Sequence, residues 1–175
     1  MGAWGLGIFQ SDYDYDIISY LDNDAGLRSL EDEARAKAQA AGHPSAKKDR
    51  EGGRDHIHFS VYADLCSDVK AVREHLDGGV LGKMHQQRKA KLNDDTEYFR
   101  PGYILVILGA CAMSLGCALP TELREYMKMN FEKVGLMRDA LVQVRKALKE
   151  YKDGEEYDFG SKGIHFFSID GTRIS

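Results

Sequence analysis

Apolar residues recur at helical spacing over most of this 175-residue chain. Ser11 has the features of a helix N-cap, and the aspartates that follow it suit the positive end of a helix dipole. The pattern predicts a first helix over about 12–21 and a second one, with a thin apolar face, that ends at Gly42.

The middle and the C-terminal half of the chain carry the same pattern. Helical spacing over 67–76 predicts one helix. The spacing resumes after a glycine-rich break at 77–79, which predicts a following helix with basic residues on its polar faces. Thr121 is expected to cap a further helical segment that runs to Tyr151, and Gly135 is expected to divide that segment in two.

The most apolar segment, 103–119, is apolar on every side and rich in glycine and alanine. Pro101 suits its first turn, because a proline there gives up no helical hydrogen bond. As a helix the segment would extend about 26 Å, short of a hydrocarbon core of about 30 Å, and the charged residues Arg100 and Glu122 flank it. We therefore expect a buried central helix rather than a membrane span.

Other segments lack the helical pattern. Glycines alternate with other residues around Trp4 and Phe9, which predicts an extended piece whose two aromatic side chains are buried. Alternation over 57–62 indicates a short strand, and 164–169 carries a similar pattern near the end of the chain. The polar segment 43–56 has almost no apolar residue to bury, so we expect a mobile loop there.

Length and composition agree with one domain. Charged residues make up 30%, the apolar set makes up 43% and the net charge is -4, which excludes wholesale disorder and a general polyanion binder. The 3 cysteines form no C-x-x-C pair and the first residues lack the features of a signal peptide, so we expect reduced thiols and a cytoplasmic or nuclear location. The predicted fold class is mainly α: a single compact multi-helix domain over 1–175 around a central apolar helix, with minor extended segments near the termini.

The opening W-G-x-G-x-F-x-S-D motif is carried by Trp4, Gly5, Gly7, Phe9, Ser11 and Asp12. It resembles the opening of a family of short uncharacterised proteins of bacteria and filamentous fungi, a domain of unknown function. Further blocks at 76–81, 101–103 and 106–110 resemble the fungal branch of that family. The resemblance implies kinship and lends no activity, cofactor or catalytic residue.

Alternate acidic residues near the start have the chemistry of a calcium loop. Asp12, Asp14 and Asp16 match the first three ligands of such a loop, but the required glycine and closing glutamate are replaced by Ile17 and Asn23. Helix capping accounts for these acids without a metal.

His56 and His58 are spaced to hold a transition metal from an extended segment, with a histidine from elsewhere completing the site. No H-E-x-x-H motif or cysteine pair accompanies them, and hydrogen-bonded or solvated histidines are the ordinary outcome. Cys66 with one of these histidines would give a thiol nucleophile and its base, whereas a buried inert thiol is the ordinary outcome for a lone cysteine.

Ser114 lies in a segment, 112–116, that imitates the nucleophile elbow of hydrolases. Its first glycine is replaced by Ala112 and no strand-helix alternation surrounds it, so we expect Ser114 to bond back to the backbone of its own helix. The glycines near the start lack the third glycine of a dinucleotide loop, and no Walker motif is present. We therefore expect no cofactor.

Basic residues gather on the helix after 77–79 and form a candidate interaction face: Lys83, Arg88, Lys89 and Lys91. Because each catalytic constellation lacks a required position, we expect a non-enzymatic protein-interaction or regulatory module whose partner is a protein, either another copy or a different one. The alternative is a small metal-dependent or thiol-based enzyme that uses His56, His58 and Cys66. Neither nucleic acid nor a membrane is expected as a partner.

Overall fold

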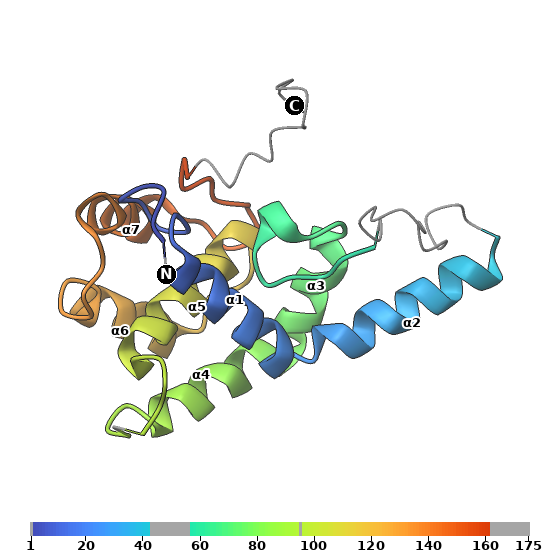
Figure 1. Cartoon of the computed structure of the whole chain (residues 1–175), viewed down its shortest axis with the longest axis horizontal. Helices are drawn as coiled ribbons and strands as arrows, with labels where there is room; N and C mark the ends of the chain where they lie inside the picture. Colours follow the sequence, from blue (N-terminus) through green and yellow to red (C-terminus); the bar gives the residue numbers. More distant parts are fainter. Residues whose placement is uncertain (1, 43–56, 95, 162–175) are drawn as a thin grey trace.

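The structure, a computed structural model, describes residues 2–42, 57–94 and 96–161. In this part of the chain the fold is mainly α, and its helices pack in one compact domain without a sheet (Figure 1). The helices are α1 (Asp12–Asp24), α2 (Leu27–Ala40), α3 (Val69–His75), α4 (Leu81–Ala90), α5 (Pro101–Leu115), α6 (Thr121–Asn130) and α7 (Arg138–Glu150). A 3-10 turn, η2 (Ala63–Leu65), precedes α3, and a π-helical turn, η3 (Leu76–Val80), joins α3 to α4.

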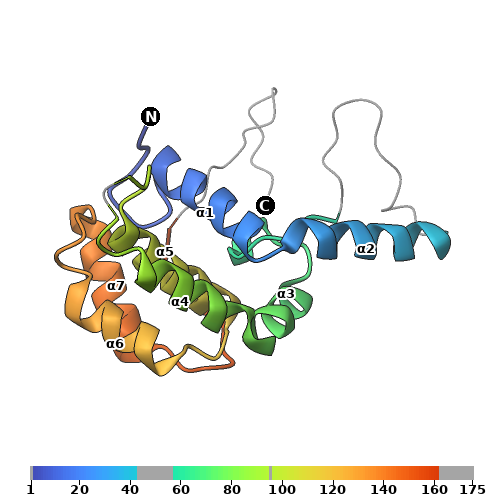
Figure 2. The same cartoon turned by 90° about the horizontal axis from the view of Figure 1, so that it is seen from below.

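Helix α5 is the centre of the domain, as its apolar sequence predicts. It contacts α1, α3, α4 and α6, and every residue from 103 to 115 is buried (Figures 1 and 2). A Cβ on Gly109 would lie 2.0 Å from the Sδ atom of Met127, so the glycine leaves room for this side chain of α6. The helix ends at Leu115 rather than at 119, because Gly116 is left-handed with a φ of 75° and its N–H bonds back to the helix.

No helix in the described ranges has both the length and the apolar character needed to cross a bilayer. Their apolar faces are directed at one another instead. The core that they form includes residues from all seven helices, as well as Phe9, Phe59 and Phe159 from segments between or beyond them.

The segment before α1 confirms one aromatic prediction and corrects another. Phe9 is fully buried, with a φ of 62° that few residues other than glycine adopt. Trp4 is 39% exposed, so the prediction that it is buried is wrong. The close backbone approach that Gly5 permits is used by the Gln10 side chain, and the indole ring lies on the outer side against Tyr15.

The predicted strand at 57–62 is also wrong, because no neighbouring strand is there to pair with it in the described chain. Carboxylates take the place of a partner strand. Glu31 accepts a hydrogen bond from the Phe59 N–H at 2.8 Å, and Asp22 accepts one from the Val61 N–H at 2.7 Å. The segment is therefore held irregularly against α1 and α2.

Smaller corrections concern helix ends. Ser11 caps α1 as predicted, since its hydroxyl accepts the Asp14 N–H at 3.2 Å. Thr121 is not a cap, because it lies inside α6 and Pro120 occupies the cap position without a side-chain hydrogen bond. The predicted glycine-rich break at 77–79 is a kink between two helical stretches, because Gly79 has a non-helical φ of 109°. The predicted loop at 43–56 and the pattern at 164–169 lie outside the described residues.

Candidate functional site

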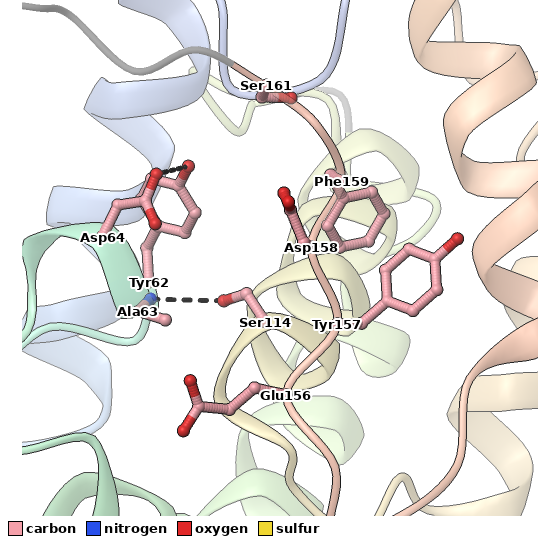
Figure 3. Close-up of a pocket in the computed structure, with 9 residues that line it drawn as sticks. All are labelled: Tyr62, Ala63, Asp64, Ser114, Glu156, Tyr157, Asp158, Phe159 and Ser161. Carbon is pink, nitrogen blue, oxygen red and sulfur yellow. Dashed lines mark hydrogen bonds between the residues drawn. The ribbon is translucent and has the colours of Figure 1, made fainter.

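A pocket of about 150 Å³ lies where the turn η2, the end of α5 and the extended segment 156–161 meet (Figure 3). Its lining residues are Tyr62, Ala63, Asp64, Ser114, Glu156, Tyr157, Asp158, Phe159 and Ser161. These residues are far apart in the sequence, so the pocket exists only in the folded chain.

The extended segment supplies two of the acidic side chains. Its backbone is fixed on α5, because the Tyr157 N–H donates to the Met113 carbonyl at 2.9 Å. Side chains alternate along extended backbone, so Glu156 and Asp158 point toward the 62–64 turn while Tyr157 points to the other side (Figure 3). Phe159 is buried and packs against Phe9, with ring centroids 5.6 Å apart.

The opposite wall is anchored on Ser114. Its hydroxyl accepts the Ala63 N–H at 3.2 Å and donates to the Cys111 carbonyl at 2.8 Å, which confirms the predicted bond back to its own helix (Figure 3). The Tyr62 hydroxyl donates to Asp64 Oδ2 at 2.8 Å. Burial raises the pKa of Tyr62, so the phenol remains a protonated donor at physiological pH.

The pocket is negatively charged. Asp64, Glu156 and Asp158 are exposed, and none of them forms an ion pair within the described ranges. Asp158 Oδ1 accepts the Gly160 N–H at 2.6 Å, which orients this carboxylate. In the part of the chain that the structure describes, no three His, Cys, Asp or Glu residues are grouped closely enough to hold a metal ion. The carboxylates therefore surround a space rather than converge on a point.

The acids predicted as a candidate metal set are placed for structural contacts. Asp12 Oδ2 accepts the Gly2 N–H at 2.6 Å. Asp14 is buried and accepts the Tyr103 hydroxyl at 2.7 Å, and burial raises its pKa. Asp16 is exposed on the same helix. These contacts agree with helix capping and packing, which the sequence also favoured.

Of the predicted histidine and thiol set, His58 and Cys66 lie in the described residues and His56 does not. The Ser67 N–H and the Ser67 hydroxyl both donate to the His58 carbonyl, at 2.8 and 3.0 Å, and the His58 N–H donates to the Ser67 hydroxyl at 2.9 Å. His58 therefore lies beside the residue that follows Cys66. The His58 imidazole nevertheless faces Glu31, with Nδ1 3.2 Å from Oε2. Burial raises the pKa of the Cys66 thiol, so the thiol form, which is not nucleophilic, predominates at neutral pH.

The predicted basic interaction face is largely occupied by ion pairs. Arg88 is only 4% exposed; it pairs with Asp24 and donates to the Tyr20 hydroxyl at 2.9 Å. Lys89 pairs with Glu122 at 3.0 Å, and Lys91 pairs with Glu97.

Lys83 is exposed. Of the four residues predicted as an interaction face, it is the one for which the structure gives neither burial nor a salt bridge in the described ranges. Arg88 is thus a structural residue that ties α4 to α1, and the positive charge of the face is mostly neutralised.

No motif marks the three carboxylates of the pocket in the sequence. The available signal is the alternation E-Y-D-F over 156–159, which places acidic and aromatic side chains on opposite sides of an extended segment. Which part of the molecule each side of this segment faces depends on the fold.

Comparison of the chain with protein-family models, with curated proteins and with solved structures finds no match. Kinship with the W-G-x-G-x-F-x-S-D family therefore stays a prediction from the residues that carry the motif.

Proposed function

We propose that this protein is a non-enzymatic interaction module, and that its acidic pocket receives a single arginine or lysine side chain of a protein partner. The observation that carries the proposal is a preformed pocket of about 150 Å³ whose three carboxylates, Asp64, Glu156 and Asp158, are not ion-paired within the described ranges. Like charges gathered around one space favour a cation there.

The size of the pocket supports one side chain rather than a larger ligand. Binding sites for drug-sized molecules and cofactors usually enclose about 300–1,000 Å³, well above the 150 Å³ found here. Guanidinium carries five N–H donors in a planar fork and bridges several acceptors at once, so it suits separated carboxylates better than a single metal ion does. Arginine is also enriched among the residues that dominate protein interfaces.

The alternative function, a thiol-based or metal-dependent enzyme, has less support. The Cys66 thiol has a raised pKa, and the His58 imidazole is engaged with Glu31 rather than with the thiol. Ser114 lines the acidic pocket, but its hydroxyl already makes two hydrogen bonds. Within the part of the chain that the structure describes, neither Cys66 nor Ser114 is hydrogen-bonded to a base that could activate it as a nucleophile.

The test is an NMR titration of the full chain with Nα-acetyl-arginine methylamide and with the neutral isostere, Nα-acetyl-citrulline methylamide. We expect the arginine probe to shift the amides of 62–64 and 156–161, and the citrulline probe to bind more weakly. Because exposed ion pairs contribute about 0.2–1 kcal/mol each, Glu156→Gln alone should weaken arginine binding about 1.4- to fivefold. Combining it with Asp64→Asn and Asp158→Asn should weaken binding by about threefold or more.

Glu155→Gln is the matched control. Glu155 is the preceding residue in the chain, is exposed and does not line the pocket, so this variant should bind the arginine probe like the wild-type chain. Equal binding of the arginine and citrulline probes, or an equal loss in the Glu155 and Glu156 variants, would show that the pocket does not select a cation.

A further inference from the structure

A second and larger pocket, of about 350 Å³, lies between the start of the chain, α1, the start of α5 and the connection from α6 to α7. Its lining residues are Gly2, Ala3, Ser11, Tyr13, Arg100, Tyr103, Gly135 and Met137. Its volume falls in the range of small-molecule sites, unlike that of the acidic pocket.

The walls of this pocket are mostly apolar. Tyr13 and Tyr103 meet edge to face with ring centroids 5.2 Å apart, and Met137 is partly exposed across from the start of the chain. The polar ends of both tyrosines are already hydrogen-bonded. The Tyr103 hydroxyl donates to Asp14, and the Tyr13 hydroxyl accepts a hydrogen bond from the backbone N–H of Arg100 at 3.3 Å. The rings therefore offer carbon surface to a ligand.

Arg100 is the only charged side chain among the residues that line this pocket in the described chain. It forms no salt bridge with a described residue, in contrast to Arg88, Arg124 and Arg145. A Cβ on Gly135 would lie 3.2 Å from Arg100 Nη1, so the glycine leaves room for the guanidinium. The acids nearby are engaged elsewhere, since Asp12 bonds Gly2 and Asp14 bonds Tyr103.

We infer that this pocket binds a small carboxylic acid with an aromatic body, whose carboxylate is held by Arg100 and whose ring packs against Tyr13, Tyr103 and Met137. A few placed polar groups in a mainly apolar lining are typical of small-molecule sites. The planar guanidinium supplies the paired N–H donors that match a carboxylate. This site is independent of the acidic pocket, with which it shares no lining residue.

Phenylacetate is a suitable probe, and phenylacetamide is its neutral isostere. Trp4, the only tryptophan, follows Ala3 of the pocket and reports binding by fluorescence, while the amides of Ala3 and Gly135 report it by NMR. We expect phenylacetate to shift both amides and phenylacetamide to bind about tenfold more weakly or worse, as for loss of a charge-assisted hydrogen-bond pair.

Arg100→Gln should weaken phenylacetate binding by about tenfold or more without changing the melting temperature, because Arg100 is exposed and makes no described salt bridge. Arg138→Gln is the matched control: Arg138 follows Met137, is 82% exposed and does not line the pocket. It should bind phenylacetate like the wild-type chain.

Several outcomes would overturn the inference. They are an absence of phenylacetate binding up to about 10 mM, equal affinity for phenylacetamide, and undiminished binding by a folded Arg100→Gln variant. An equal loss in the Arg138→Gln variant would replace the specific site with general charge attraction. Tighter binding of phenyl phosphate than of phenylacetate would overturn the assignment of the ligand as a carboxylic acid.

Discussion

Helices α5 and α2 are stabilised in opposite ways. Helix α5 has no charged side chain and is buried on every side by α1, α3, α4 and α6. Helix α2 extends away from the other helices in both views of the domain, and Leu27 at its start is its only fully buried residue (Figures 1 and 2). The other residues of α2 are half-buried or exposed, and the ion pair of Arg35 with Asp32 at 3.2 Å is a local contact within the helix.

The junction between α1, α2 and the segment 57–62 is held by carboxylates rather than by apolar packing alone. Asp22 accepts N–H and hydroxyl donors from Val61 and Ser60, and Glu31 accepts the Phe59 N–H. Burial raises the pKa of Asp22 to about 6, because its effect outweighs that of the hydrogen bonds from Val61 and Ser60, which lower the pKa. The stability of this junction should therefore depend on pH.

The largest effect is expected in α5. Ile107→Ala removes a fully buried side chain and leaves a cavity, so it should lower the free energy of unfolding by about 2–5 kcal/mol. Denaturant unfolding at pH 4.5 and pH 7.5 should give the same loss, because no titrating group is removed. A loss below about 1 kcal/mol would show that α5 is not packed as described.

Asp22→Asn should have an intermediate effect that depends on pH. Since the folded protein holds a proton on Asp22 that the unfolded chain releases, this residue contributes stability that is full below about pH 4 and is lost as the pH rises through about 6. Asparagine retains an oxygen acceptor and does not titrate. The variant should thus gain about 1–3 kcal/mol relative to the wild-type chain between pH 4 and pH 7.

The measurement for Asp22→Asn is the difference in unfolding free energy between variant and wild type across that pH range. Asp16→Asn, on the same helix but exposed, is the control and should show no such trend. A difference that stays constant with pH would contradict the raised pKa of Asp22.

The smallest effect is expected in the exposed part of α2. Ala36→Gly lowers helix propensity at an exposed position, which costs about 1 kcal/mol in a helix interior. Because this part of α2 stands away from the domain, the cost should appear mainly as faster amide exchange within α2 (Figure 2). A loss of global stability well above 1 kcal/mol would indicate that this face is packed against another part of the chain.

Much of the helical architecture could be predicted from the sequence, because periodic apolar residues and end signals act locally. The position of α5 follows from its unbroken apolar run after Pro101, and the cap on α1 follows from Ser11. The division between α6 and α7 follows from Gly135, which has a φ of 90°. Each of these features depends on residues that are close together in the chain.

The sequence did not determine what each polar or aromatic side chain meets. Trp4 and Phe9 both lie in the glycine-rich segment before α1, yet only Phe9 is buried in the core, where it packs against Tyr62 and Phe159. Residues 57–62 alternate like a strand, but carboxylates from α1 and α2 satisfy their backbone. The sequence predicts Arg88 as part of an exposed basic face, but in the structure its side chain is buried beside Asp24.

Both proposed sites arise from the same kind of long-range contact. The acidic pocket needs Asp64 and Glu156, and the second pocket needs Tyr13 and Arg100, residues that are far apart in the chain. The sequence by itself determined which segments are helical and which helix is central, since propensity and apolar periodicity are local properties. The tertiary structure alone decided which charges are paired and which remain available at a pocket, because the distance between two charges is set by packing between elements.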